Sequence, residues 1–304
     1  IEHIALVESI SYTIAKYLGL NTELTKAIAT AHDIGHSPFG HQGEKILANI
    51  CKRDIGENFW HERNGLEFVD KIELLENPKG QLQNLNLTYA VRDGIISHCG
   101  ETDENGVKPR EECIDLKDYI NTNQYAPYTW EGCVVKIADK ISYLGRDIAD
   151  AVTIGIIDEK QEQLYELLGL DYSEKINNTI IVNELIYDLC QNSSIETGLS
   201  FSKDMFRKMN ELKKFNYKNI YLSEKLKNST MYFELVLNKI YDVLKESYKD
   251  REKMLKICPD LVNDFNDWIK NYWNLERNSK NINQIVFDVN NERDYYKAAI
   301  YYST

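Results

Sequence analysis

A histidine and an aspartate stand side by side at His32 and Asp33, within the segment AHDIGHSPFGHQGE of residues 31–44. An adjacent imidazole and carboxylate can bind one divalent cation together, and such a cation can activate water for attack on a phosphate ester. All six histidines lie in the first third of the chain, and histidines placed only by packing would not gather in this way. The pattern predicts a metal-dependent phosphohydrolase.

Two further residues extend the candidate metal ligands. One helix face offers too few directions for a complete ligand set, so we expect groups from several helices. His3 precedes the pair, and Asp139 interrupts the apolar run VVKIADKI, where a carboxylate without a cation would be costly. Taken alone, each residue has a simpler interpretation. His3 could be a histidine packed in the core, and Asp139 could be a solvent-exposed helix residue beside Lys140.

His41 and Glu44 are three residues apart on one expected helix, so they share a face. A histidine near a phosphate can donate a proton to a departing oxygen, and a carboxylate can fix its tautomer or position water. The alternative for Glu44 is a carboxylate in the first helical turn, favoured by the helix dipole.

A long helix carries Asp139, Tyr143 and Asp147 at intervals of four residues, a stripe of ~12 Å at the rise of an α-helix. Such a stripe can reach from a metal to a bound sugar. The alternatives are a half-buried aromatic for Tyr143 and an ion pair with Arg146 for Asp147. A basic stretch follows, which can contact phosphates or be a solvated helix face; it contains Arg207, Lys208, Lys213 and Lys214, with Tyr217 after it.

The elements that must position these residues are helical. The chain has only five prolines, and apolar residues recur with the helical period over most of its length. We expect Thr22 and Ser37 to cap helices and a polar connector over residues 100–128. The pattern predicts an all-α fold with helices near residues 4–18, 22–35, 37–50, 64–76, 87–98, 130–156, 158–168, 174–192, 202–214, 219–248 and 260–277.

The order of His3, His32–Asp33 and Asp139 resembles the H…HD…D signature of the HD-domain phosphohydrolase superfamily. Within it, the segments HDIGHSPFGHQGE, LNLTYAVRDGI and DKISYLGRDI resemble the deoxynucleoside triphosphate triphosphohydrolases of the dGTPase-like family. The similarity covers residues 1–150 and continues more weakly to about residue 230. It implies an HD-domain helical fold with peripheral helices. Residues 1–156 would form the hydrolase core, and residues 157–304 a helical extension that completes the nucleotide site within one continuous globular unit.

The resemblance also implies roles for individual residues. His3, His32, Asp33 and Asp139 would bind a divalent metal ion such as Mn²⁺, Mg²⁺ or Fe²⁺. His41 would act as the acid–base catalyst, supported by Glu44. His61 and Glu62 would form a second histidine–glutamate pair beside it. His36 and His98 are expected to be structural or to support other ligands. Lys140 would contact the triphosphate, Tyr143 the deoxyribose and Asp147 the 3′-hydroxyl, and further substrate contacts are expected from Arg207, Lys208 and Tyr217.

The implied reaction is hydrolysis of a deoxynucleoside triphosphate (dNTP) to deoxynucleoside and inorganic triphosphate. One alternative is another HD phosphohydrolase acting on nucleoside monophosphates, cyclic dinucleotides or guanosine tetraphosphate, although no GYP motif follows the HD pair. Another is a nucleotide sensor or single-stranded DNA-binding protein without turnover. Relatives assemble as symmetric oligomers, frequently hexamers, and some bind a second dNTP at an allosteric site. The nucleobase preference is not encoded in these motifs, and we expect residues upstream of Ile1 to contribute to it.

The composition of the chain limits its possible partners and its cellular compartment. The net charge of −12 argues against coating of nucleic acid, and an anionic substrate therefore needs a local positive site. No apolar stretch has the ~20 residues of a membrane helix, and no signal peptide is present. The six cysteines include no C-x-x-C pair, which favours reduced thiols in the cytoplasm.

Overall fold

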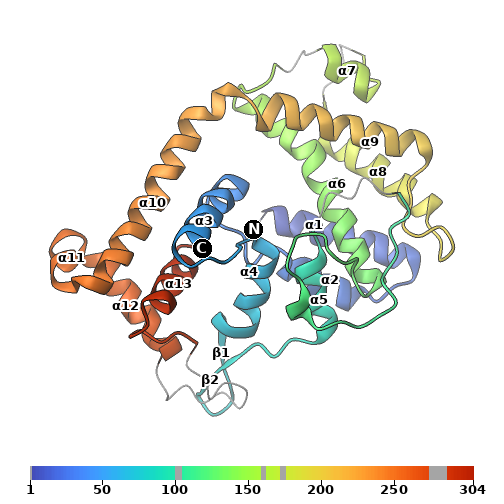
Figure 1. The fold of residues 1–304 in the computed structure, drawn as a ribbon. Coiled ribbons are helices and arrows are strands. Elements are labelled where there is room, and N and C mark those ends of the chain that lie inside the picture. Colours follow the sequence, from blue (N-terminus) through green and yellow to red (C-terminus); the bar gives the residue numbers. More distant parts are fainter. Residues whose placement is uncertain (1, 100–104, 159–161, 172–175, 274–285) are drawn as a thin grey trace. The chain divides into compact units, whose positions relative to one another are not determined.

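The computed structural model describes residues 2–99, 105–158, 162–171, 176–273 and 286–304 (Figure 1). It is all-α, as predicted, with thirteen α-helices and one two-stranded sheet among the described residues. Contacts divide the chain into two compact units. Unit 1 comprises Ile1–His32 and Tyr89–Lys227, and unit 2 comprises Asp33–Thr88 and Asn228–Thr304. The predicted division at residue 156 stays a prediction.

Unit 1 is built around one long buried helix. The apolar side chains of Ile141, Leu144 and Ile148 on this helix are fully buried. Its helices are α1 (Glu2–Leu18), α2 (Thr22–Ala31), α5 (Tyr89–Ser97), α6 (Trp130–Thr153), α7 (Glu162–Leu168), α8 (Asn178–Asn192) and α9 (Lys203–Asn216), with the π-helix η3 (Tyr217–Tyr221) and the 3₁₀-helices η2 (Leu116–Asp118) and η4 (Glu224–Leu226).

Unit 2 has a core rich in aromatic side chains. Tyr241 and Phe265 are fully buried there among Leu47, Leu244 and Ala299. Its elements are α3 (Gly40–Asp54), α4 (His61–Glu67), the π-helix η1 (Phe68–Ile72), strands β1 (Leu74–Glu76) and β2 (Leu82–Asn84), α10 (Lys227–Lys249), α11 (Arg251–Ile257), α12 (Pro259–Trp273) and α13 (Glu292–Tyr302). The strands pair antiparallel, with Leu75 opposite Gln83.

Both predicted helix caps are wrong. Asn21, not Thr22, caps α2, and its side-chain oxygen accepts hydrogen bonds from the backbone N–H groups of Glu23 and Leu24, each at 3.1 Å. An asparagine in extended backbone is at least as good a cap as threonine, so the helix starts one residue after it. The Ser37 hydroxyl donates to the Gly40 carbonyl at 3.0 Å instead of accepting from the first turn. Consequently α3 begins at Gly40 rather than at residue 37.

Several other helices begin or end at residues different from those predicted. The second helix ends at Ala31, so His32 stands at its C-terminus rather than inside it. The helix predicted over residues 64–76 ends at Ile72, where Glu73 adopts extended backbone and the chain enters the first strand of the β-hairpin. The helix predicted from residue 219 begins at Lys227. Parts of the predicted connector and of the helices at 158–168, 174–192 and 260–277 lie outside the described residues.

A buried ion pair holds part of the connector on α5. Asp93 is almost fully buried and accepts from the Arg110 guanidinium and, at 2.7 Å, from the backbone N–H of Tyr128. Burial raises the pKa of the Asp93 carboxyl despite both donors. Across the parts of the chain that the structure covers, no helix is both long and apolar enough to span a lipid bilayer.

Candidate metal centre and histidine–carboxylate cluster

Three predicted metal ligands meet within unit 1. His3 lies in the first turn of α1, His32 directly follows α2, and Asp139 lies in the middle of α6. The Oδ1 atom of Asp139 is 3.1 Å from Nε2 of His3 and 3.8 Å from Nε2 of His32. His32 is fully buried, whereas His3 and Asp139 are partly exposed.

Hydrogen bonds fix the tautomers of both imidazoles. Nδ1 of His32 lies 2.6 Å from the carbonyl of Ala29, so this nitrogen carries the proton. The Ser142 hydroxyl donates to the carbonyl of Asp139 at 2.8 Å, so its oxygen accepts from Nδ1 of His3 at 3.4 Å. In the neutral form of each ring, Nε2 then directs its lone pair toward the carboxylate oxygen, an arrangement that a bound cation would stabilise.

The spacing fits a divalent metal ion. Two bonds of ~2.1 Å from one ion place their donor atoms roughly 3–4.2 Å apart. The Asp139 distances of 3.1 and 3.8 Å fall in this range, and ligand atoms of all three residues lie within 4.8 Å of one another. Two imidazoles and one carboxylate suit several first-row divalent ions, so the donor set alone does not select one.

The fourth predicted ligand, Asp33, follows His32 in the chain, and the boundary between the two units falls between them. Its role as a ligand stays a prediction. His98, expected to support other residues, lies in unit 1 with its ring edge-on to His32 at a centroid distance of 5.0 Å. Nδ1 of His98 is 2.7 Å from the carbonyl of Ile95, which fixes its ring in the same way.

The stripe predicted along α6 continues from the metal centre. Asp147 accepts a hydrogen bond from the hydroxyl of Tyr221 on η3. Burial raises the pKa of the Asp147 carboxyl, although the bond from Tyr221 acts in the opposite direction. The alternative of an ion pair with Arg146 is not found, since that guanidinium donates to Glu2 at 2.7 Å and approaches Asp150 at 3.6 Å.

The predicted basic substrate residues differ in their surroundings. Arg207 donates to Asp204 at 3.2 Å, and Lys208 donates to Glu184 at the same distance. Tyr217 is 57% exposed and contacts Tyr221 edge-on, with ring centroids 6.4 Å apart. Tyr217 is thus linked to Asp147 through Tyr221. Substrate binding by all three predicted residues stays a prediction.

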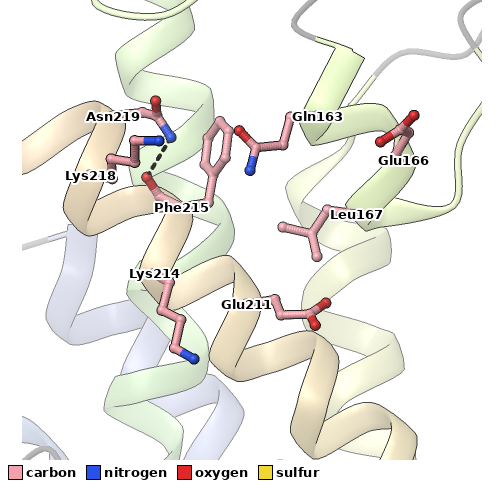
Figure 2. A pocket seen from close by; sticks show the side chains of 8 residues that line it. All are labelled: Gln163, Glu166, Leu167, Glu211, Lys214, Phe215, Lys218 and Asn219. Atoms are coloured by element: carbon pink, nitrogen blue, oxygen red, sulfur yellow. Dashed lines mark hydrogen bonds between the residues drawn. The ribbon is translucent and has the colours of Figure 1, made fainter.

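A cavity of about 500 Å³ opens between α7, α9 and η3 (Figure 2). It has mixed charge, with the acidic and basic side chains on different sides. Lys214, from the basic stretch, is one of its lining residues. The others are Gln163, Glu166, Leu167, Glu211, Phe215, Lys218 and Asn219.

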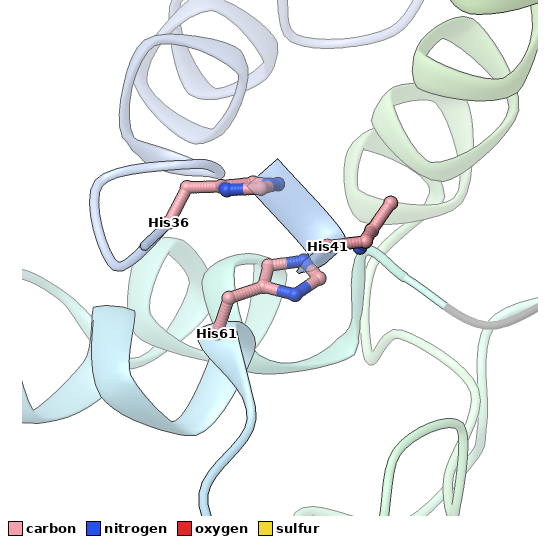
Figure 3. A group of neighbouring side chains, drawn as sticks. All are labelled: His36, His41 and His61. Carbon is pink, nitrogen blue, oxygen red and sulfur yellow. The ribbon is translucent and has the colours of Figure 1, made fainter. Parts of the chain in front are cut away.

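Three histidines gather in unit 2 (Figure 3). His36 comes from the turn before α3, His41 from the start of α3 and His61 from the start of α4. The ring centroid of His36 lies 4.9 Å from that of His61 and 5.3 Å from that of His41. The rings of His41 and His61 are 5.7 Å apart.

Close backbone packing brings α4 against the turn that carries His36. A Cβ atom at Gly35 would lie 2.0 Å from the backbone nitrogen of Gly65, so only glycine fits there. The side chain of Asn64 donates to the Gly35 carbonyl at 2.8 Å and fixes the same approach. Within α3, a Cβ at Gly43 would lie 1.7 Å from the carbonyl oxygen of Pro38. These contacts set the places of His36, His41 and His61.

Glu44 lies beside both His41, its predicted acid–base partner, and His61. Its Oε2 accepts from Nδ1 of His61 at 2.8 Å and lies 3.6 Å from Nδ1 of His41. Burial would raise the pKa of the Glu44 carboxyl, but the hydrogen bonds from the two imidazoles outweigh it and hold the pKa well below its usual range. Glu44 is therefore an anion at neutral pH. The neighbouring Glu62 is only 1% exposed, and its Oε2 lies 3.4 Å from the same nitrogen of His61.

Sequence reasoning missed two contributors to these clusters. Tyr221 and Ser142 act through tertiary contacts with Asp147 and His3, and no local spacing reveals such partners. His36, expected to be structural or to support other ligands, lies with its ring in the histidine group. Its role stays a prediction.

Comparisons with known proteins agree with these motifs. Residues 1–144 match the family model of the HD domain. A deoxyguanosinetriphosphate triphosphohydrolase-like protein of Desulfatibacillum aliphaticivorans is 33% identical over 79% of this chain and 62% of the relative. A protein of the same description from Clostridium perfringens is 31% identical over 85% of this chain and 68% of the relative. The chain thus spans less than two thirds of the length of the first of these relatives. It belongs to the HD-domain family of deoxyguanosinetriphosphate triphosphohydrolase-like proteins.

Proposed function

We propose that this chain hydrolyses deoxynucleoside triphosphates to deoxynucleoside and inorganic triphosphate with the help of a divalent metal ion. One observation carries the proposal: two Nε2 lone pairs and one carboxylate oxygen converge at His3, His32 and Asp139. Membership of the family and the names of the relatives support the substrate class.

The metal ligands in this proposal are His3, His32, Asp33 and Asp139. A bound divalent ion supplies polarisation of the α-phosphoryl group and a more acidic water. The protein contributes a fixed orientation, because the carbonyl of Ala29 and the hydroxyl of Ser142 hold the imidazole rings. Such outer partners are as much a part of metal affinity as the ligands themselves.

His41 is the proposed general acid, which protonates the departing 5′ oxygen. Its side chain is 71% exposed, so a substrate can reach it. Glu44 stays ionised and can stabilise the imidazolium form of His41, while its shorter hydrogen bond to His61 keeps the carboxylate in place. His61 thereby supports the same step.

Substrate recognition is proposed for the α6 stripe and the basic stretch. Lys140 would contact the triphosphate, Tyr143 would pack against the deoxyribose, and Asp147 would accept from the 3′-hydroxyl. Tyr221 already donates to Asp147 and would hold the carboxylate in position for this contact. Further contacts are proposed from Arg207, Lys208 and Tyr217.

The assembly and location of the protein also stay proposals. A homo-oligomer, a hexamer in particular, and a second dNTP at an allosteric site are what the family resemblance implies; binding of single-stranded DNA is the weaker alternative. Cys51, Cys133 and Cys190 are buried free thiols, which suits the proposed cytoplasmic location.

Product analysis tests the reaction. The protein is incubated with Mn²⁺ or Mg²⁺ and each of the four dNTPs or GTP, and ion chromatography separates triphosphate, diphosphate and phosphate. We expect triphosphate and deoxynucleoside in equal amounts, and little product from GTP. His41→Ala should retain metal and lose turnover, whereas Asp139→Asn should lose both. Release of phosphate alone, or full activity in His41→Ala, would refute the assignment.

A further inference from the structure

The histidine group of unit 2 has the geometry of a metal site that the proposed reaction does not use. One ring nitrogen from each of His36, His41 and His61 lies within 4.8 Å of the other two. We propose that these three histidines bind a second divalent ion of the class that prefers imidazole, such as Zn²⁺, and that this ion inhibits the enzyme by occupying His41.

Hydrogen-bond acceptors face the same nitrogen of each ring. Nδ1 of His36 lies 3.3 Å from the carbonyl of Ser37, and Nδ1 of His61 lies 2.8 Å from Glu44. Nδ1 of His41 approaches the same carboxylate at 3.6 Å. With the protons on Nδ1, the lone pairs are on the three Nε2 atoms, which is the tautomer that metal-bound histidines adopt when a carboxylate or carbonyl supports them.

Little movement is needed to form the site. Three imidazoles on a tetrahedral ion with bonds of ~2.1 Å have their nitrogen atoms roughly 3.4 Å apart, and a water takes the fourth position. His61 is buried and His36 is half-buried, so both rings are held by their surroundings. The exposed side chain of His41 can rotate to close the remaining gap.

The charges of this cluster favour a cation. Glu62 is nine-tenths buried or more, and neither of its carboxylate oxygens accepts a hydrogen bond from the residues that the structure describes. Glu44 and Glu62 flank Nδ1 of His61, so two carboxylates share one donor. An ion on Nε2 of His61 would make that imidazole more positive and offset the cost of burying Glu62.

The ligand types also determine which ion fits this site. A set of three imidazoles selects Zn²⁺, Cu²⁺, Ni²⁺ or Co²⁺ over Mg²⁺, which prefers oxygen ligands. This preference separates the site from the mixed nitrogen and oxygen set of unit 1.

Inhibition follows from the proposed role of His41, and this half of the inference rests on the proposed function. An Nε2 atom bound to a metal ion cannot carry the proton that the departing 5′ oxygen needs. Zn²⁺ added beyond the first equivalent should therefore suppress turnover. Binding itself does not depend on the reaction, because it follows from the geometry of three histidines.

The test compares metal binding and turnover in the same proteins. The metal-free protein is titrated with Zn²⁺ in equilibrium dialysis, and Co²⁺ absorption spectra report the ligand geometry. We expect two Zn²⁺ per wild-type chain and one in His36→Gln, whose second-site affinity should fall at least about 100-fold, since even outer partners are worth 10–100-fold. Asp139→Asn should keep the second site and lose the first.

Glu62→Gln provides an independent variant, and we expect its second-site affinity to fall roughly 10–100-fold. Glu73→Gln, an exposed carboxylate of the same unit, is the matched control and should bind two ions as the wild type does. Thermal unfolding establishes that each variant is folded.

Activity supplies the second readout. The Zn²⁺ concentration that halves the turnover of His36→Gln, measured against the turnover of the same variant without added Zn²⁺, should rise by the same factor of about 100. A single Zn²⁺ per wild-type chain, or two in His36→Gln, would overturn the second site. Two ions in the wild type with no effect of Zn²⁺ on turnover would overturn inhibition. If no protein turns over any dNTP, the proposed function fails, and the dialysis still decides the site.

Discussion

At the scale of single residues, the orientation of two imidazole rings is what makes a metal centre out of this polar cluster. His3 and His32 each direct Nδ1 to an oxygen acceptor and Nε2 toward Asp139. An ordinary ion pair would need a proton on Nε2 of one of these rings. The partners of Nδ1, the hydroxyl of Ser142 and the carbonyl of Ala29, are therefore part of the function of the site.

Ser142→Ala tests this view. Removal of the hydroxyl takes away the acceptor for Nδ1 of His3, so that imidazole is less well oriented and binds metal more weakly, by roughly 10-fold. Isothermal titration with Mn²⁺ measures the change. Ser11→Ala, a buried serine on α1, is the matched control and should leave affinity unchanged. Equal affinities in both variants would contradict the proposed role of Ser142.

The Glu44 carboxylate makes stability depend on pH in a defined direction. Its pKa is lower in the folded chain than its ordinary value of 4.5, chiefly because the hydrogen bonds from His41 and His61 outweigh burial. The contribution of the ionised group is therefore complete above pH 4.5 and is lost as the pH falls below that value. Urea unfolding of wild type and Glu44→Gln measures it. The difference between their free energies of unfolding should shrink below pH 4.5, and a constant difference would be inconsistent with the lowered pKa.

At the scale of elements, a strained backbone precedes the helix that carries His41 and Glu44. Phe39 has a left-handed backbone with φ of 65°, a conformation that costs a bulky residue about 1–3 kcal/mol. Its ring stacks on Phe233 of α10, with centroids 4.2 Å apart and planes within 7°. The stack helps to hold Phe39 in place where α3 begins.

Phe233→Ala removes this support. We expect the free energy of unfolding to fall by about 1–2 kcal/mol, since a stacked aromatic pair adds 0.5–1.5 kcal/mol beyond the lost apolar burial. Because α3 positions His41, kcat should fall several-fold while KM changes little. Leu235→Ala removes an exposed side chain of the same helix and should have neither effect. Unchanged kcat in a destabilised Phe233→Ala would limit the stack to a structural role.

The elements also explain what the sequence could and could not predict. Regular apolar spacing predicted α1 and α6 within a few residues, and family motifs predicted three ligands that the fold brings together. The helix α13 is not predicted, because it has only 11 residues and its buried residues Tyr295, Tyr296 and Ala298–Ile300 form an almost continuous run, so its few turns do not mark the helical period. The partnership of Tyr221 with Asp147 joins residues 74 positions apart, and local patterns carry no information on it.

At the scale of the whole molecule, the division into units is not contiguous in sequence. The segment Asp33–Thr88 leaves unit 1 after His32 and packs with residues beyond Asn228. Local periodicity cannot predict this arrangement, because the apolar spacing of a helix does not reveal which of the two units it packs into. Each unit holds one histidine–carboxylate cluster, and the two have different roles in the proposed reaction: ligands of a metal ion in unit 1, and acid–base groups in unit 2.

In the proposed reaction both roles serve the cleavage of one bond, between the α-phosphorus and the 5′ oxygen. The most direct test is hydrolysis of a dNTP in ¹⁸O-water with Mn²⁺, followed by mass spectrometry of both products. The account predicts one ¹⁸O atom in the released triphosphate and none in the deoxynucleoside, because water attacks phosphorus and the 5′ oxygen leaves with the sugar. Label in the deoxynucleoside, or release of phosphate or pyrophosphate in place of triphosphate, would contradict it.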